Sequence, residues 1–151
     1  MNKKFWPALI SAALLQSGCV TWYQSQPKVE GLMLNSQGQP LADQQVTLES
    51  NAGSETTQSD GAGRFTFSGK HELAFFIPIG PIDWIHQAKL QVPAAGQVNT
   101  FNLGGAFGNS HAFDGAQFAV VCQIPATTQL PPPEICHREL MENVTGNQPP
   151  K

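Results

Sequence analysis

The chain has 151 residues, of which 40% are hydrophobic and only 13% are charged, and its formal net charge is −3. This length accommodates one domain rather than two. The composition excludes a coiled coil and a polybasic nucleic-acid binder, so we expect no nucleic acid among the partners. Fourteen Gly and twelve Pro predict many turns and short strands instead of a helical bundle.

The first residues have the layout of a secretory signal peptide. Lys3 and Lys4 give a positively charged start, and an apolar run from Phe5 to Leu15 follows. That run is shorter than the roughly 20 residues that a membrane-spanning helix needs. We therefore expect residues 1–18 to be a removable leader, whose two lysines leave six basic and eleven acidic side chains behind.

Small residues at the end of this leader precede a cysteine. The segment Leu15-Gln16-Ser17-Gly18-Cys19 resembles a bacterial lipobox, in which the cysteine is acylated and becomes the mature N-terminus; Gln16 departs from the usual pattern. The resemblance implies palmitate or similar acyl chains on Cys19, and several chains hold a membrane far better than one. Val20 in place of Asp implies export to the outer membrane, on its periplasmic side or at the cell surface. The alternative is an ordinary signal peptide with an incidental cysteine.

Three cysteines are present, and acylation of Cys19 would leave Cys122 and Cys136. An even remainder in an oxidising compartment predicts a disulfide. The bridge would close a loop of about 15 residues, which the chain-entropy model values at roughly 3 kcal/mol. The alternatives are two free thiols, or a metal bound by both cysteines and His137, which the lack of a CxxC spacing disfavours.

The predicted organisation has four parts. Residues 1–18 are the signal peptide, 19–27 a polar tether, 28–142 the β-sandwich domain and 143–151 a disordered tail. The tether contains Trp22 and Tyr23, which either lie at the bilayer interface or pack on the edge of the domain.

From Lys28 onward, apolar and polar residues alternate in short segments between turns, which is the pattern of β-strands. The predicted strands are 29–34, 45–49, 55–58, 64–68, 71–77, 86–92, 97–103 and 116–122. Val46 and Leu48 are expected on one buried face, and so are Phe65 and Phe67. This spacing is typical of an antiparallel sandwich, whereas 134–143 fits a helical turn or a last strand.

Three stretches of this region resemble a known family: 31–41, 46–48 and 60–67. Their order of strand, G-x-P-L turn, V-x-L strand and D-x-x-G-x-F turn is similar to the carboxypeptidase regulatory-like, or transthyretin-like, domain. The resemblance covers about residues 29 to 67. It implies an all-β fold, an antiparallel Greek-key β-sandwich of the transthyretin (prealbumin) type, and says almost nothing about activity.

The turns of this region use residues with specific backbone chemistry. Gly38 and Gly63 suit positions with positive φ, and Pro40 fixes φ where its turn ends. Asp60 can accept hydrogen bonds from the backbone amides of its own turn. A calcium site at Asp60 is the alternative, which the single carboxylate disfavours.

The search for catalytic motifs gives no positive result. The sequence has neither a zinc-peptidase pattern nor a G-x-S-x-G elbow. Ser110, His111 and Asp114 are the residue types of a triad, but neighbours on one loop do not easily form the required line. We predict no catalytic residues, no metal and no cofactor. An enzyme would be favoured by a pocket that brings His86, His111 or His137 together with Asp83 or Asp114.

The segment Ala74–Ile85 is strongly apolar, contains two prolines and does not alternate as a sandwich strand should. One interpretation is a strand buried on both faces, or a loop that crosses the end of the core. The other is an exposed loop that docks on a partner or on the bilayer, with Phe76, Ile77 and Trp84 as its anchors.

These features together predict a lipid-anchored envelope lipoprotein. Its β-sandwich would be a non-enzymatic binding or structural module for an envelope protein partner, held at the membrane by the lipid anchor. One alternative is a small-ligand or glycan-binding module, which an open groove lined by Trp84 would favour. The others are an immunity or inhibitor lipoprotein and an enzyme of unrecognised type.

Overall fold

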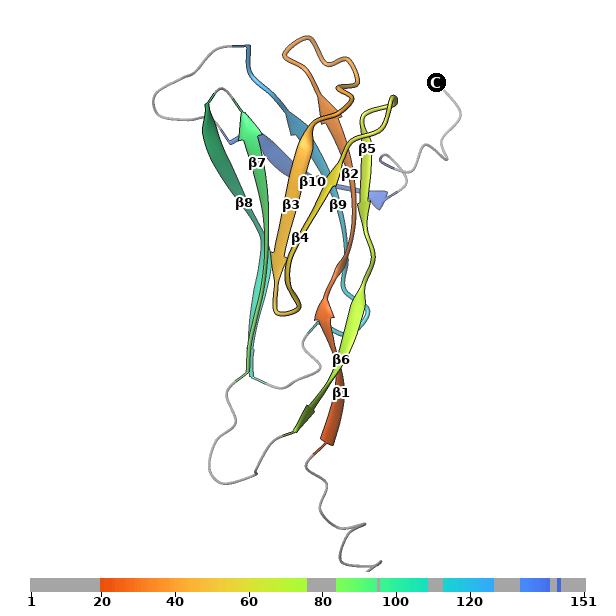
Figure 1. The fold of residues 1–151 in the computed structure, drawn as a ribbon, viewed down its shortest axis with the longest axis vertical. Helices are drawn as coiled ribbons and strands as arrows, with labels where there is room; N and C mark the ends of the chain where they lie inside the picture. Colours follow the sequence, from red (N-terminus) through yellow and green to blue (C-terminus); the bar gives the residue numbers. More distant parts are fainter. Residues whose placement is uncertain are drawn as a thin grey trace, which may run out of the picture.

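A computed structural model describes residues 20–75, 84–94, 96–108, 113–126, 134–141 and 144. This part of the chain is built from strands (Figure 1). They are β1 (Val20–Gln26), β2 (Lys28–Leu34), β3 (Gln45–Ser50), β4 (Gly53–Gln58), β5 (Arg64–Phe67), β6 (Lys70–Phe75), β7 (Trp84–Ala94), β8 (Gln97–Gly108), β9 (Gln117–Gln123) and β10 (Cys136–Glu139). No helix among the described residues is long and apolar enough to cross a membrane.

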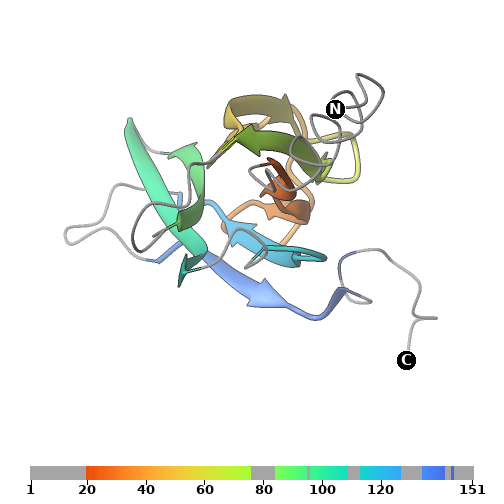
Figure 2. The same cartoon turned by 90° about the horizontal axis from the view of Figure 1, so that it is seen from below.

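The strands form three sheets. Two of them have four strands each, in the orders β10-β9-β2-β5 and β4-β3-β7-β8, and the third is the two-stranded β1–β6 ribbon. Figure 2, seen from below, shows these elements arranged around a common interior. The all-β sandwich predicted from the sequence is confirmed.

One strand pair differs from the expected antiparallel arrangement. β2 and β9 run parallel, with Val29 opposite Phe118 and Met33 opposite Cys122. β9 follows β8, which belongs to the other four-stranded sheet, so the chain changes sheets before β9 begins. Because many residues lie between β2 and β9 in the chain, β9 can pair with β2 in either direction, whereas two strands joined by a tight turn can only pair antiparallel.

The β1–β6 ribbon continues one edge of the sandwich. β1 leads through Pro27 into β2, and β5 leads through Ser68 and Gly69 into β6. The antiparallel register also continues, from Val29 opposite Phe67 to Gln26 opposite Lys70. Proline has no N–H to donate to a strand neighbour, which accounts for the break between β1 and β2. The result is one long antiparallel strand pair whose lower half extends beyond the sandwich (Figure 1).

This ribbon replaces the predicted tether. Tyr23 to Gln26 are buried within β1, and the strand begins at Val20. Of the predicted tail, 143–151, the structure describes Val144 alone, which is buried. The polar composition of residues 20–26 suggested an unpacked segment, but long-range hydrogen bonds hold β1 in place.

The core lies between the two four-stranded sheets. Met33 and Phe67 on one sheet and Leu48 and Leu90 on the other are completely buried. As the alternation predicts, Val46 is buried with Leu48, and Phe65 with Phe67. Of the two alternatives for 134–143, the last strand is present as the short β10, and Met141 after it is helical.

The turns confirm their predicted chemistry. Gly38 and Gly63 have φ values of 77° and 75°. The Asp60 carboxylate accepts hydrogen bonds from the backbone N–H groups of Ala62 and Arg64, at 2.9 and 2.8 Å. Asp60 therefore has a structural task within the turn that leads into β5.

Candidate functional site

Two of the three cysteines are joined in the structure. Cys122 on β9 and Cys136 on β10 form a disulfide, with their Cα atoms 4.0 Å apart. The two residues are direct antiparallel partners and both are buried. The predicted bridge is thus present and closes the edge of the sheet. The predicted lipid-attachment residue, Cys19, lies outside the described residues.

An aromatic cluster fills the space between the ribbon and the lower part of β7. The Tyr23 ring lies 4.9 Å from the Trp84 ring and 5.9 Å from the His86 ring, centroid to centroid. His86 is completely buried, and Phe113 lies 5.2 Å from it. Burial and the nearby Glu72 carboxylate raise the pKa of Tyr23, which keeps its hydroxyl neutral.

This cluster bears on the predicted partner anchors. Trp84 is half-buried and its ring packs against Tyr23 and stacks on His86, so much of its surface serves internal packing. Phe76 and Ile77, the other two predicted anchors, lie outside the described residues. The partner-binding role of this trio stays a prediction.

Two buried glutamines attach the ribbon to the sandwich. The Gln26 side-chain amide donates to the Glu55 carboxylate at 2.9 Å and to the Ser68 carbonyl at 2.8 Å, and the Ser50 hydroxyl donates to its oxygen at 3.2 Å. The Gln24 side chain accepts from the Gly115 N–H at 2.7 Å. These bonds reach β3, β4 and the segment before β9, so the ribbon is fixed from several sides.

The same attachment lowers the pKa of the Glu55 carboxyl. The hydrogen bond from Gln26, followed by the one from Lys70, holds the pKa of the Glu55 carboxyl below its ordinary value. Lys70 is the first residue of β6 and Glu55 lies on β4, so the ion pair also joins the ribbon to the sandwich. No local sequence pattern points to these residues, since their partners are distant in the chain.

The other groups proposed as signs of an enzyme have structural contacts of their own. His137 Nε2 lies 3.4 Å from Glu139 Oε1 on β10, and the Asp114 carboxylate accepts the Gln24 backbone N–H at 3.2 Å. Ser110, His111 and Asp83 lie outside the described residues. No group of three or more His, Cys, Asp or Glu in the described part is arranged to hold a metal ion.

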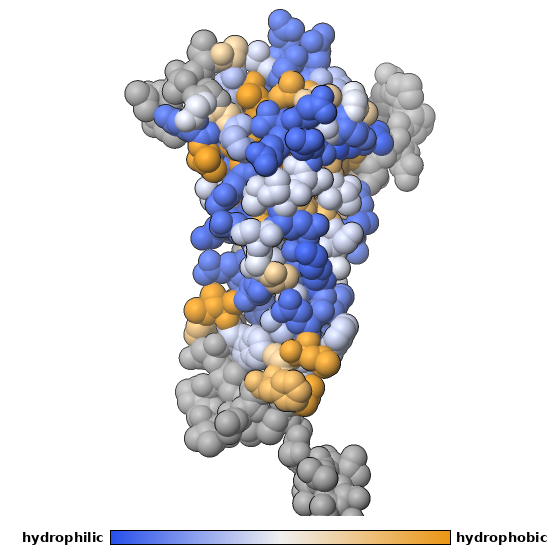
Figure 3. All heavy atoms as spheres, viewed as in Figure 1, coloured by the Kyte–Doolittle hydropathy of each residue, from blue (hydrophilic) through white to orange (hydrophobic). Residues whose placement is uncertain are grey.

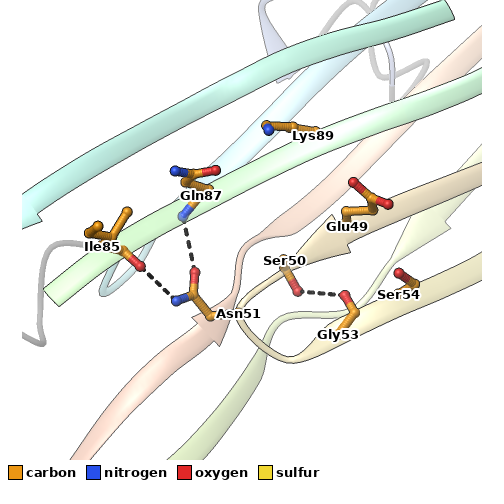
Figure 4. Close-up of a pocket in the computed structure, with 8 residues that line it drawn as sticks. All are labelled: Glu49, Ser50, Asn51, Gly53, Ser54, Ile85, Gln87 and Lys89. Carbon is orange, nitrogen blue, oxygen red and sulfur yellow. Dashed lines mark hydrogen bonds between the residues drawn. The ribbon is translucent and has the colours of Figure 1, made fainter.

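A hollow lies on the outer face of the sheet, where β3 ends and β7 continues (Figure 4). The Asn51 side chain donates to the Ile85 carbonyl at 2.7 Å and accepts from the Gln87 N–H at 3.0 Å. These bonds continue the β3–β7 contact beyond the last paired backbone residues, Glu49 and Lys89. The hollow is lined by Glu49, Ser50, Asn51, Gly53, Ser54, Ile85, Gln87 and Lys89.

The character of this hollow is polar and open. Carboxylate, hydroxyl, amide and ammonium groups surround it, and among the described lining residues Ile85 is the one large hydrophobic side chain. Trp84 does not line it, so it gives no support to the glycan-binding alternative. Figure 4 shows the side chains of Glu49, Gln87 and Lys89 spread along neighbouring strands rather than converging on one point.

A second surface feature is apolar. Figure 3 shows hydrophobic side chains gathered at the lower end of the molecule, below a largely hydrophilic middle. We call this region the apolar end and define it by six exposed residues at the lower ends of the ribbon and of the β7–β8 hairpin: Val20, Trp22, Leu73, Phe75, Ile85 and Phe107. Residues 20–26 do not alternate, so no local pattern signals the apolar end, and the partners of Val20 and Trp22 on β6 lie far along the chain.

Comparison with known proteins adds no family to this account. No family model matches the chain, and no curated protein is significantly similar to it. The resemblance to the transthyretin-like domain therefore rests on the residues between 29 and 67 alone.

Proposed function

We propose that the protein is a lipid-anchored envelope lipoprotein that presents a small β-sandwich as a non-enzymatic binding module for a protein partner. Acylation at Cys19 would attach it to the outer membrane. The sandwich would then stand at the membrane surface, on the periplasmic side or at the cell surface, without a cofactor.

The observation that carries the proposal is the pairing of the cysteines. Cys122 and Cys136 are joined in a disulfide, and Cys19 is the only other cysteine in the sequence. A disulfide of this kind is typical of exported proteins, since cytosolic thiols are kept reduced. The leader-like start, the lipobox-like segment and the disulfide all favour the same compartment.

The expected cleavage site lies close to the described fold. Val20, a residue of β1, directly follows the cysteine that we expect to become the mature N-terminus.

For the partner contact we propose the polar hollow between β3, β4 and β7. Its carboxylate, ammonium and amide groups suit the polar groups of another protein better than an apolar small molecule. Glu49 and Lys89, which face each other in register, offer one charge of each sign. The predicted apolar anchors Phe76, Ile77 and Trp84 are the alternative contact.

Metabolic labelling with an alkyne-tagged palmitate tests the anchor. We expect label on the wild-type protein and none on Cys19→Ser. The matched control is the Cys122→Ser, Cys136→Ser double variant, which loses the other two thiols and is expected to keep the label. Label on Cys19→Ser, or none on the wild type, would refute the lipoprotein proposal.

Site-specific photo-crosslinking in intact cells tests the partner contact. A photoreactive residue at Gln87, which is exposed in the hollow, should yield a discrete adduct. The same residue at Thr66, which is exposed on β5, should not. Equal adducts from both positions, or none from Gln87, would contradict the hollow as the contact.

A further inference from the structure

The apolar end has a regular construction on the ribbon. Val20 lies opposite Phe75, and Trp22 lies opposite Leu73. Directly opposed residues of an antiparallel pair share a face, and so do residues two apart on one strand. These four side chains therefore form two rows on one face, and they are exposed, Trp22 by 57% and Phe75 by 80%.

The sandwich contributes a second apolar pair at the same end. Ile85 and Phe107 lie opposite each other on β7 and β8, and both are exposed. Tyr23 and Trp84, in ring contact at 4.9 Å, connect the ribbon with the β7–β8 hairpin behind these surfaces. The lower end thus carries exposed hydrophobic residues on both the ribbon and this hairpin (Figure 3).

The position of Cys19 in the sequence indicates what covers the apolar end. Consecutive Cα atoms are about 3.8 Å apart, so the Cα of Cys19 lies next to Val20 at the tip of the ribbon. Val20 is already paired with Phe75 in the ribbon, so no spacer separates the cysteine from the fold. If acyl chains on Cys19 enter a bilayer, the tip of the ribbon has to meet the bilayer surface.

We propose that the apolar end rests in the interface of the lipid bilayer and holds the sandwich upright on it. This inference builds on the proposed lipidation of Cys19 and adds a second, non-covalent contact with the membrane. Trp22 is the central residue of the contact, because indole rings favour the headgroup region, where one part of the ring is apolar and another can hydrogen-bond.

The dimensions of the ribbon fit this position. The two rows are two residues apart along the strands, which is about 7 Å. The interfacial zone on each side of a bilayer is about 5–8 Å thick. Both rows therefore reach into this zone while the rest of the ribbon remains in water.

Because the ribbon is attached to the sandwich, its contact with the membrane also fixes the orientation of the sandwich. Gln26 bonds to Glu55 and Ser68, and Gln24 bonds to Gly115, so a ribbon held in the membrane carries the sandwich with it. The long axis of the molecule in Figure 1 then points away from the bilayer.

The charges near the apolar end agree with a zwitterionic surface. Among the described residues of the ribbon, no ionisable side chain lies in the first row, Val20 and Phe75, or beside it, at Thr21 and Ala74. The next residues of β6 are Glu72, within 3.4 Å of the Tyr23 hydroxyl, and His71, whose ring stacks on Trp22 at 5.9 Å. The acidic excess of the chain disfavours anionic lipid, so phosphatidylcholine is the appropriate probe.

The test is quenching of Trp22 fluorescence by phosphatidylcholine brominated near the headgroup end of its acyl chains. Full-length protein, purified with its anchor, is reconstituted in these vesicles and in unbrominated ones. The difference between the wild type and Trp22→Phe gives the Trp22 signal without altering Trp84. We expect the brominated lipid to reduce that signal at least about twofold, as for an interfacial tryptophan.

Two comparisons control the position. In a Val98→Trp variant of Trp22→Phe, the new ring lies near the other end of β8, about 30 Å along the strand from Phe107, and should not be quenched. The double variant Leu73→Ser, Phe75→Ser should lose quenching of Trp22. The double variant Val98→Ser, Leu140→Ser changes equally exposed residues elsewhere and should keep it.

The outcomes separate the two proposals. An acylated Cys19 in the mass spectrum with unquenched Trp22 overturns the membrane contact and leaves the lipoprotein assignment intact; the apolar end then belongs to a protein surface. Quenching at both Trp22 and Trp introduced in place of Val98 means that the domain lies flat and overturns the upright orientation. A mass spectrum without lipid refutes the proposed function, and this inference falls with it.

Discussion

The β2–β5 pair of the sandwich continues into the β1–β6 ribbon, yet the two regions direct their side chains in opposite ways. In the sandwich, Phe67 and Met33 point inward to the core. In the ribbon, Trp22 and Phe75 point to solvent, while Gln24 and Gln26 are buried. The sandwich is therefore held by hydrophobic packing, and the ribbon by hydrogen bonds and an aromatic cluster. The exposed apolar face of the ribbon is available for a contact outside the molecule.

The largest difference in stability between the two regions should appear when one phenylalanine in each is replaced by alanine. Phe67→Ala leaves a cavity in the core, and we expect a loss of about 3–5 kcal/mol in the free energy of unfolding. Phe75→Ala removes a ring that is already in water and should change stability by no more than about 0.5 kcal/mol. Urea unfolding of both variants checks this. Equal losses would mean that the ribbon is part of the core.

The disulfide should have the next largest effect. The double variant Cys122→Ala, Cys136→Ala loses the bridge between β9 and β10, and we expect a loss of about 3 kcal/mol. Thermal unfolding with and without a reducing agent measures it. The wild type should respond to the reductant and the double variant should not; an unchanged wild type would show that the bridge adds no stability.

Gln26 tests the polar attachment of the ribbon. Gln26→Leu leaves the Ser50 hydroxyl and the Ser68 carbonyl without this partner, and we expect a loss of about 1–3 kcal/mol. Gln117→Leu, at an exposed position on β9, is the matched control and should cost much less. Hydrogen exchange of the β1 amides should rise in Gln26→Leu alone. A similar effect of both substitutions would refute a special role for Gln26.

The smallest expected effect is a pH dependence at Glu55. Its folded-state pKa lies below the ordinary value of 4.5, so its contribution is complete above that value and is lost as the pH falls through the lowered pKa. The carboxylate is partly exposed, which limits the contribution to less than about 1 kcal/mol. Glu55→Gln keeps an acceptor for Gln26 but should lack this acid-dependent loss. Parallel pH profiles of unfolding for both proteins would contradict the assignment.

Local pattern was sufficient for most of the sandwich. Alternation placed Val46, Leu48, Phe65 and Phe67 on buried faces, because a strand with one face on a core must alternate. The number of cysteines was enough to predict the disulfide. The turns at Gly63 and Asp60 followed from backbone chemistry that a few neighbouring residues determine.

The ribbon and the parallel pair needed information that a local pattern does not contain. Gln24 and Gln26 resemble solvent-exposed residues until Gly115, Glu55 and Ser68, far along the chain, satisfy their side chains. The partnership of β2 with β9 likewise depends on a chain that changes sheets. For the same reason, the apolar end became recognisable only when the register put Trp22 beside Leu73.

The most direct test of the account is the intact mass of the chain extracted from membranes by detergent. We predict a protein that begins at Cys19, carries the additional mass of its acyl chains, and retains the Cys122–Cys136 disulfide. A chain that keeps its leader, or one that begins with an unmodified thiol, would contradict the lipid-anchored binding module.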